Sequence, residues 1–237
     1  MSTTSPWGDL PEMKRPGHPR RNAILVILLL LVLPLGYLGG SYLVRHALAD
    51  SQMRLDLASK ALSGGFDRMA VRLLTPLAET GDAQAQYRLA ILYEQGSGTP
   101  RDGRRAVGLY RKAANQGLVS AQDRLGEIYL RGTLVLQDLA KARQWFEKAA
   151  MAGNLDAQLE LAHIYERGLG VTQDHIEAYA WNAVAAATGD TLAADQRDRN
   201  LRTLSVDDQV KAEARAHTLV TSMKERPASS AQLAPST

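Results

Sequence analysis

Two short patterns in the chain have a spacing that could support chemistry. His163 and Glu166 form an H-x-x-E pair, which could hold a metal ion or act as a general base. No second histidine stands at a metal-ligand spacing, because His175 falls in a different predicted loop. Gly168–Gly170 reads G-x-G, but it follows a predicted helix rather than a strand and therefore predicts a turn. With no G-x-S-x-G or H-E-x-x-H motif, we predict no catalytic residue, no metal and no cofactor.

Composition excludes further classes of function. The sequence has no cysteine, which rules out a thiol nucleophile, a thiolate metal site and a lipoprotein-type anchor. Lys and Arg number 28 against 25 Asp and Glu, and the net charge is only +3. Because the basic residues are not clustered, we expect no nucleic-acid partner.

The elements that position these residues repeat along the chain. Four glycines recur at a fixed spacing of 36 residues, and they are Gly81, Gly117, Gly153 and Gly189. A period in this range is typical of a stack of similar supersecondary units. The spacing predicts three units, over 81–116, 117–152 and 153–188.

Each unit carries the same helix signals. In the first unit Ala85, Leu89 and Tyr93 are four residues apart and share one helix face. Gly96 follows where a helix end favours positive φ, and Asp102 then has the type of an N-cap. The same residue types recur in the other two units, and each second helix ends in paired alanines. The pattern predicts two packed helices per unit.

The units resemble the Sel-one-like repeat family, a relative of the tetratricopeptide repeat. The resemblance rests on AQYRLAILYEQGSGTPRDGRRAVGLYRKAANQG and on AQLELAHIYERGLGVTQDHIEAYAWNAVAAATG. It implies an all-α fold, a short right-handed α-solenoid of helix-turn-helix repeats. The middle unit departs at Leu134, where its neighbours have Gly98 and Gly170, and we expect one reshaped loop.

The flanks of the repeats predict capping elements. Residues 45–80 read as a linker and a divergent N-terminal helix pair, and residues 189–226 as C-terminal capping helices. The last of these begins at Ser205, with Asp208 at the capping-box spacing. Residues 227–237 are rich in Pro, Ser and Ala and are predicted to be disordered.

Positions that differ between units predict a binding surface. On the first helix of each unit they fall at steps of three and four, so each set forms one helix stripe. The resemblance implies that this stripe lines a concave groove holding a protein or peptide partner; the alternative is an ordinary solvated face. The predicted groove residues are Gln84, Tyr87, Ile91, Glu94, Gln95, Ser120, Asp123, Glu127, Leu130, Arg131, Asp156, Leu159, His163, Glu166 and Arg167.

The segment Ala23–Val44 predicts a membrane anchor. Its 22 residues carry no charge, and as a helix they would span about 33 Å. Basic residues concentrate before it, so the positive-inside rule leaves residues 1–22 as a disordered cytoplasmic tail and exports the repeats. The alternative is a signal peptide cleaved after Ala49, which exports the same domain. Gly36 and Gly40 form a G-x-x-x-G that could support a weak homodimer through the bilayer, although this spacing also arises by chance.

These observations predict a bacterial inner-membrane scaffold or adaptor with a periplasmic repeat domain, which binds a peptide or an envelope protein in its groove. One alternative is a regulator that transmits groove occupancy through the cytoplasmic tail. Another is a hydrolase of cell-wall or β-lactam compounds, an activity proposed for cysteine-rich relatives. The absence of cysteine removes the feature on which that resemblance would rest.

Overall fold

A computed structural model of the chain describes residues 50–225. The predicted anchor Ala23–Val44, the Gly36/Gly40 pair, the tail 1–22 and the tail 227–237 lie outside the described residues. Within 50–225, no helix has both the length and the apolar character needed to cross a membrane. The chain divides into two compact units, and the one that begins at Met53 contains the repeats.

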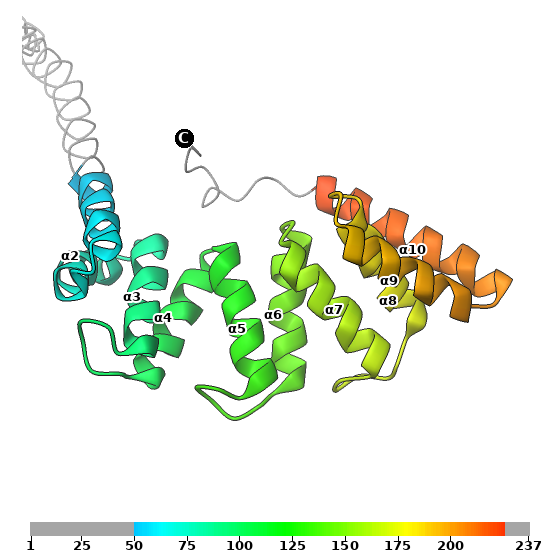
Figure 1. Cartoon of the computed structure of the whole chain (residues 1–237), viewed down its shortest axis with the longest axis horizontal. Helices are drawn as coiled ribbons and strands as arrows, with labels where there is room; N and C mark the ends of the chain where they lie inside the picture. The colour runs from blue at the N-terminus through cyan, green and yellow to red at the C-terminus, as the bar shows by residue number, and fades with distance from the viewer. Residues whose placement is uncertain (1–49, 226–237) are drawn as a thin grey trace, which may run out of the picture. The chain divides into compact units, whose positions relative to one another are not determined.

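Every regular element in residues 50–225 is a helix, and from α2 to α9 each helix packs on the next one in the chain (Figure 1). A helix over 50–63 comes first. It is followed by α2 (Asp67–Glu79), α3 (Ala83–Gln95), α4 (Gly103–Asn115), α5 (Val119–Arg131), α6 (Leu139–Met151), α7 (Leu155–Arg167), α8 (His175–Ala186), α9 (Thr191–Thr203) and α10 (Val206–Lys224). The last helix, α10, packs back onto α8. The prediction of an all-helical solenoid of repeated helix pairs is confirmed.

The repeated glycines and aspartates end and begin helices as predicted. Gly96, Gly132 and Gly168 are left-handed C-caps, with φ of 75°, 67° and 66°. The second helix of each unit begins after an aspartate whose carboxylate accepts a backbone N–H of the first turn: Asp102, Asp138 or Asp174. These caps fix the loop between the two helices of a unit.

One glutamine in each unit is buried against the preceding unit, a feature that the sequence analysis did not single out. Its side-chain nitrogen donates to the carbonyl oxygen of an alanine on the preceding helix. The pairs are Gln86 with Ala78, Gln122 with Ala114 and Gln158 with Ala150, at 3.0, 3.0 and 3.1 Å. Because both partners recur every 36 residues, the same hydrogen bond joins each unit to the one before it.

Two aromatic side chains, Phe146 and Tyr110, are fully buried in the core. Trp145 is only partly buried, whereas its neighbour Phe146 is fully buried, and so is Tyr110 in the unit before. Phe146 packs against Gly126, where an added Cβ would lie 2.5 Å from the ring atom Cε1. Gly126 therefore leaves room for this ring.

At Leu134 the backbone of the middle unit's loop differs from that of the equivalent glycines. Gly98 and Gly170 both have φ of 69°, whereas no residue other than glycine has positive φ in the described chain. Leu134 lies over Gly103, where an added Cβ would be 3.2 Å from Leu134 Cδ2. In the next unit, a Cβ on Gly170 would lie 2.5 Å from Leu139 Cβ. Each contact thus pairs a glycine with a leucine. The middle unit supplies the leucine in both, Leu134 against Gly103 and Leu139 against Gly170.

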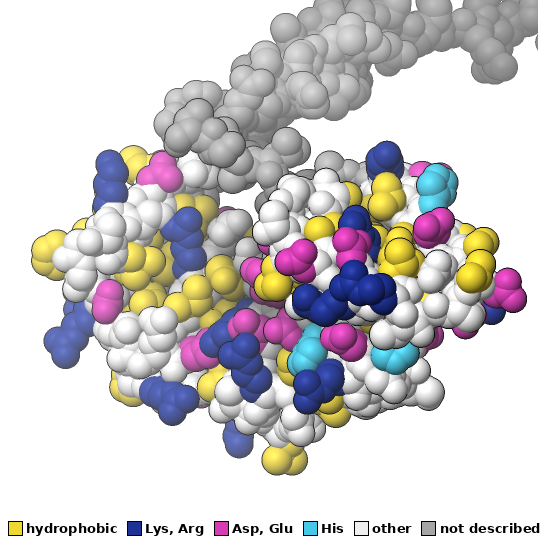
Figure 2. All heavy atoms as spheres, turned by 45° about the vertical axis from the view of Figure 1, so that its right-hand side comes forward, with side chains coloured by type: hydrophobic (Ala, Val, Ile, Leu, Met, Phe, Trp, Pro, Cys, Tyr) yellow, Lys and Arg dark blue, Asp and Glu magenta, His cyan; other side chains and the backbone are white. Residues whose placement is uncertain are grey.

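Charged side chains of both signs are interspersed on the face shown in Figure 2. Hydrophobic side chains lie between them in small groups. The large exposed hydrophobic residues of the described chain are spread from Met53 to Val210. On this face, neither charged nor hydrophobic side chains form one continuous stripe.

Candidate interaction groove

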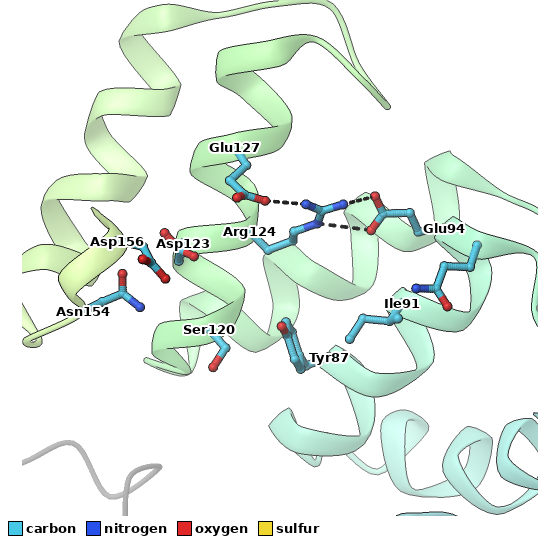
Figure 3. A pocket seen from close by; sticks show the side chains of 10 residues that line it. Tyr87, Ile91, Glu94, Ser120, Asp123, Arg124, Glu127, Asn154 and Asp156 are labelled. Carbon is cyan, nitrogen blue, oxygen red and sulfur yellow. Dashed lines mark hydrogen bonds and ion pairs between the residues drawn. The ribbon is translucent and has the colours of Figure 1, made fainter. Parts of the chain in front are cut away.

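A groove of about 500 Å³ follows the first helices of the first two units, α3 and α5, and reaches the beginning of α7 (Figure 3). Its residues recur at helical steps of three and four and so project from one face of each helix. They are Tyr87, Ile91, Glu94, Gln95, Ser120, Asp123, Arg124, Glu127, Asn154 and Asp156.

Arg124 joins two units across the groove. Its guanidinium, from α5, forms ion pairs with Glu94 of α3 and with Glu127 one turn away (Figure 3). Its Nε also donates to Glu94 Oε2 at 3.3 Å. Partial burial acts to lower the pKa of Arg124, but hydrogen bonds to both carboxylates raise it, so the cation is retained.

Tyr110 forms a further hydrogen bond to this ion-pair group. It is fully buried on α4, and its hydroxyl donates to Glu94 Oε2 at 2.6 Å. Burial and the hydrogen bond to Glu94 raise the pKa of Tyr110, which keeps the hydroxyl a donor. Glu94 is therefore held by a tyrosine and an arginine, which fixes its carboxylate at the groove wall.

Asp123 is the least satisfied group in the groove. Its Oδ1 is buried and has no hydrogen-bond partner within the described residues. Burial raises the pKa of Asp123 to about 6, helped by the negative charges of Glu127, Asp156 and Glu160 and opposed by Arg124. Above this pH the groove holds a carboxylate that lacks a matching donor.

The lining as a whole is acidic, with a small apolar area. It holds four carboxylates and one guanidinium, and that guanidinium is already paired with two of the carboxylates. Tyr87 and Ile91 add apolar contact area, and the Tyr87 ring lies 5.7 Å from the Tyr110 ring, centroid to centroid. The arrangement suits a cationic side chain next to an apolar one.

The structure brings together about half of the predicted groove residues. Those that line the groove are Tyr87, Ile91, Glu94, Gln95, Ser120, Asp123, Glu127 and Asp156. Those outside the lining are Gln84, Leu130, Arg131, Leu159, His163, Glu166 and Arg167. Arg124 and Asn154 also line the groove and were not predicted to do so. Position 124 did carry a signal, because its equivalents are Arg88 and Glu160, a change of charge within the repeat.

The H-x-x-E pair does not gather further ligands. His163 is exposed on α7, and the backbone carbonyl of Glu166 accepts a hydrogen bond from Gln173 Nε2 at 2.7 Å. Among the residues that the structure describes, no group of three or more His, Cys, Asp or Glu could hold a metal ion.

Comparison with known proteins agrees with this architecture. The family described as Sel1 repeat matches residues 83–118, 119–154 and 155–190. A crystal structure of a Sel1 repeat protein from Oxalobacter formigenes is similar at 26% identity, with a TM-score of 0.56 and 69% of each chain covered. The protective antigen c5321 of uropathogenic Escherichia coli, which displays an SLR fold, matches at 25% identity and a TM-score of 0.44, over 79% of this chain and 50% of the other. Comparison with curated proteins gives no match.

The fold thus defines a helical-repeat solenoid. Its three consecutive units, residues 83–190, match the Sel1 repeat, and the Sel1 repeat protein of Oxalobacter formigenes is similar in fold.

Proposed function

We propose that this protein is an interaction scaffold whose groove binds a partner segment carrying Lys or Arg side chains. The Sel1-repeat solenoid supports the general class, because solenoids of this kind expose extended surfaces to protein partners. The unpartnered carboxylate oxygen of Asp123 is the single observation that carries the finer proposal.

A cationic side chain would neutralise the Asp123 carboxylate. Glu94 and Glu127 are engaged by Arg124, whereas Asp123 Oδ1 lacks a donor in the described chain. A Lys or Arg of the partner would donate to Asp123, with the nearby charge of Asp156 adding attraction. An apolar residue of the same segment would then contact Tyr87 and Ile91 at the other end of the groove.

Labelled octapeptides of alternating Arg-Ala, Glu-Ala and Ser-Ala provide a direct test. We expect fluorescence anisotropy to show binding of the Arg-Ala peptide to the full-length protein and little binding of the other two. Asp123→Asn should weaken that binding by about tenfold, since a charge-assisted hydrogen bond is lost. The matched control is Asp195→Asn, which removes an exposed carboxylate of α9 outside the groove lining. Equal binding of all three peptides, or equal loss in both variants, would refute the proposal.

We also propose that Ala23–Val44 anchors the scaffold in a bacterial inner membrane, with the tail 1–22 in the cytoplasm and the repeats in the periplasm. The support is the uncharged length of this segment and the basic residues before it. A reporter fused after Glu225 should be active only if it is exported. Cytoplasmic reporter activity would contradict this topology. The homodimer through Gly36 and Gly40 and signalling through the tail stay predictions.

A further inference from the structure

A second cavity, of about 440 Å³, lies between α2, α3 and α4 and shares no residue with the groove. We call it the first-unit cavity. Its lining residues are Thr75, Ala78, Glu79, Leu89, Tyr93, Arg105, Gly108, Leu109 and Lys112. A Cβ added to Gly108 would meet no atom within 4 Å, so this wall of the cavity is open.

The next unit shows what occupies the equivalent place. Thirty-six residues further on, Leu109 is replaced by Trp145 and Gly108 by Gln144. The Trp145 indole is partly buried against the core, and the ammonium of Lys148 lies 4.0 Å from its ring centroid. In the second unit, the equivalent place is therefore filled by the Trp145 indole, with the Lys148 ammonium on its face.

A third exchange keeps the first-unit cavity open. The equivalent of Thr75 is Arg111, whose Nη2 donates to the hydroxyl of Tyr129 at 3.0 Å. Thr75 is too short for this contact and instead donates its hydroxyl to the Val71 carbonyl at 2.7 Å. All three exchanges place a smaller residue beside the first-unit cavity, one on α2 and two on α4.

The groups that would contact an indole are retained in the first unit. Lys112 is the equivalent of Lys148, and Tyr93 is the equivalent of Tyr129. Arg105 holds Tyr93 in place, with its Nη1 3.2 Å from the hydroxyl and its guanidinium carbon 5.4 Å from the ring centroid. Leu89 gives the cavity a buried apolar floor.

In the third unit, Trp181 and helix α10 cover the equivalent face. Trp181 is buried and belongs to the same hydrophobic cluster as Leu219 and Val220 of α10, the helix that packs on α8. Of the three equivalent faces, the one in the first unit has neither an indole nor a covering helix within the described residues.

We propose that the first-unit cavity is a binding site for an aromatic side chain of a protein partner, with tryptophan as the preferred residue. The bound indole takes the place that Trp145 fills in the second unit, with Lys112 over its face and Leu89 beneath it. Cation–π attraction and apolar burial both favour indole over an aliphatic side chain. This site is independent of the acidic groove and gives the scaffold a second anchor point.

Ligand-observed ¹⁹F NMR with N-acetyl-5-fluorotryptophanamide and the full-length protein tests the site. We expect saturable line broadening with a dissociation constant of about 1 mM, typical of a single small aromatic group. Filling the cavity to match the second unit, with Thr75→Arg, Gly108→Gln and Leu109→Trp together, should weaken binding at least about tenfold.

Two lysine variants form a matched pair, because Lys112 lines the first-unit cavity and its equivalent Lys148 does not. Lys112→Met should weaken binding about threefold, as expected for loss of one exposed cation–π contact, whereas Lys148→Met should leave it unchanged. The groove variant Asp123→Asn should also bind the probe as the wild type does, which separates this site from the proposed groove. No broadening with the wild type, unchanged binding by the filled variant, or equal effects of the two lysine variants would overturn the proposal.

Discussion

Replacing Asp123 by Asn should stabilise the protein at neutral pH and should weaken the binding of a basic segment in the groove. The folded-state pKa of this carboxyl is about 6, against an ordinary value of 3.8, chiefly because of its burial. The folded state thus holds the proton more tightly than the unfolded state does. Stability is lost as the pH rises from 3.8 to about 6, and the full cost is present above that window. Asparagine has nearly the same shape and carries no charge.

The size of the effect follows from these two values. The difference between 3.8 and about 6 corresponds to about 3 kcal/mol in full. The side chain is only partly buried, and solvent screening reduces this to about 1 kcal/mol at pH 7.5, with a fraction of that at pH 4.5. A change of this size raises the melting temperature by about 2–4 °C in a domain of this length.

Urea unfolding followed by circular dichroism, at pH 4.5 and pH 7.5, measures the difference between wild type and variant. Asp195→Asn on α9 is the control, and its exposed site should change stability by less than about 0.5 kcal/mol at either pH. The reasoning fails if Asp123→Asn is the less stable protein at pH 7.5, or if its effect does not depend on pH. A more stable variant that binds its partner less well would identify a carboxylate kept for binding.

Two further predictions concern the packing between helices. Gly126→Ala should destabilise the protein by about 1–3 kcal/mol, because the new Cβ would lie 2.5 Å from Phe146 Cε1. Adding Phe146→Leu should recover part of that loss, and a double-mutant cycle with no coupling would contradict the contact. Gln158→Leu should cost about 0.5–1.5 kcal/mol in urea unfolding, because the Ala150 carbonyl loses its 3.1 Å hydrogen bond to this side chain but still accepts from the Gly153 N–H. An unchanged midpoint would show that this hydrogen bond adds nothing.

The helix boundaries were predictable because their causes are local. A glycine at the end of a helix can adopt positive φ, and Gly96 does so; an aspartate before a helix can cap its first turn, and Asp102 does so. Gln86 escaped notice because hydrophobic periodicity does not flag a polar residue whose partner lies on another helix. Its signal was the spacing: glutamine at the same place in every unit.

The groove was only partly predictable, because its membership depends on how neighbouring units are placed. Tyr87 and Asp123 could be assigned to helix stripes from spacing alone, and both line the groove. His163 belongs to the same stripe of the third unit but lies outside the lining. Arg124 was missed because its role depends on Glu94, which is 30 residues away and comes within reach only when α3 and α5 pack.

Photocrosslinking in cells tests the central claim, that the acidic groove binds a basic partner segment, most directly. A photoreactive amino acid replaces Tyr87 in the groove of the full-length protein, and Gln144, exposed on α6 and outside the groove lining, serves as the control position. The crosslinked segment of the partner is then sequenced. We predict capture from position 87 only, of a segment that contains Lys or Arg, with a lower yield in Asp123→Asn. Equal capture from both positions, or a captured segment without basic residues, would contradict the claim.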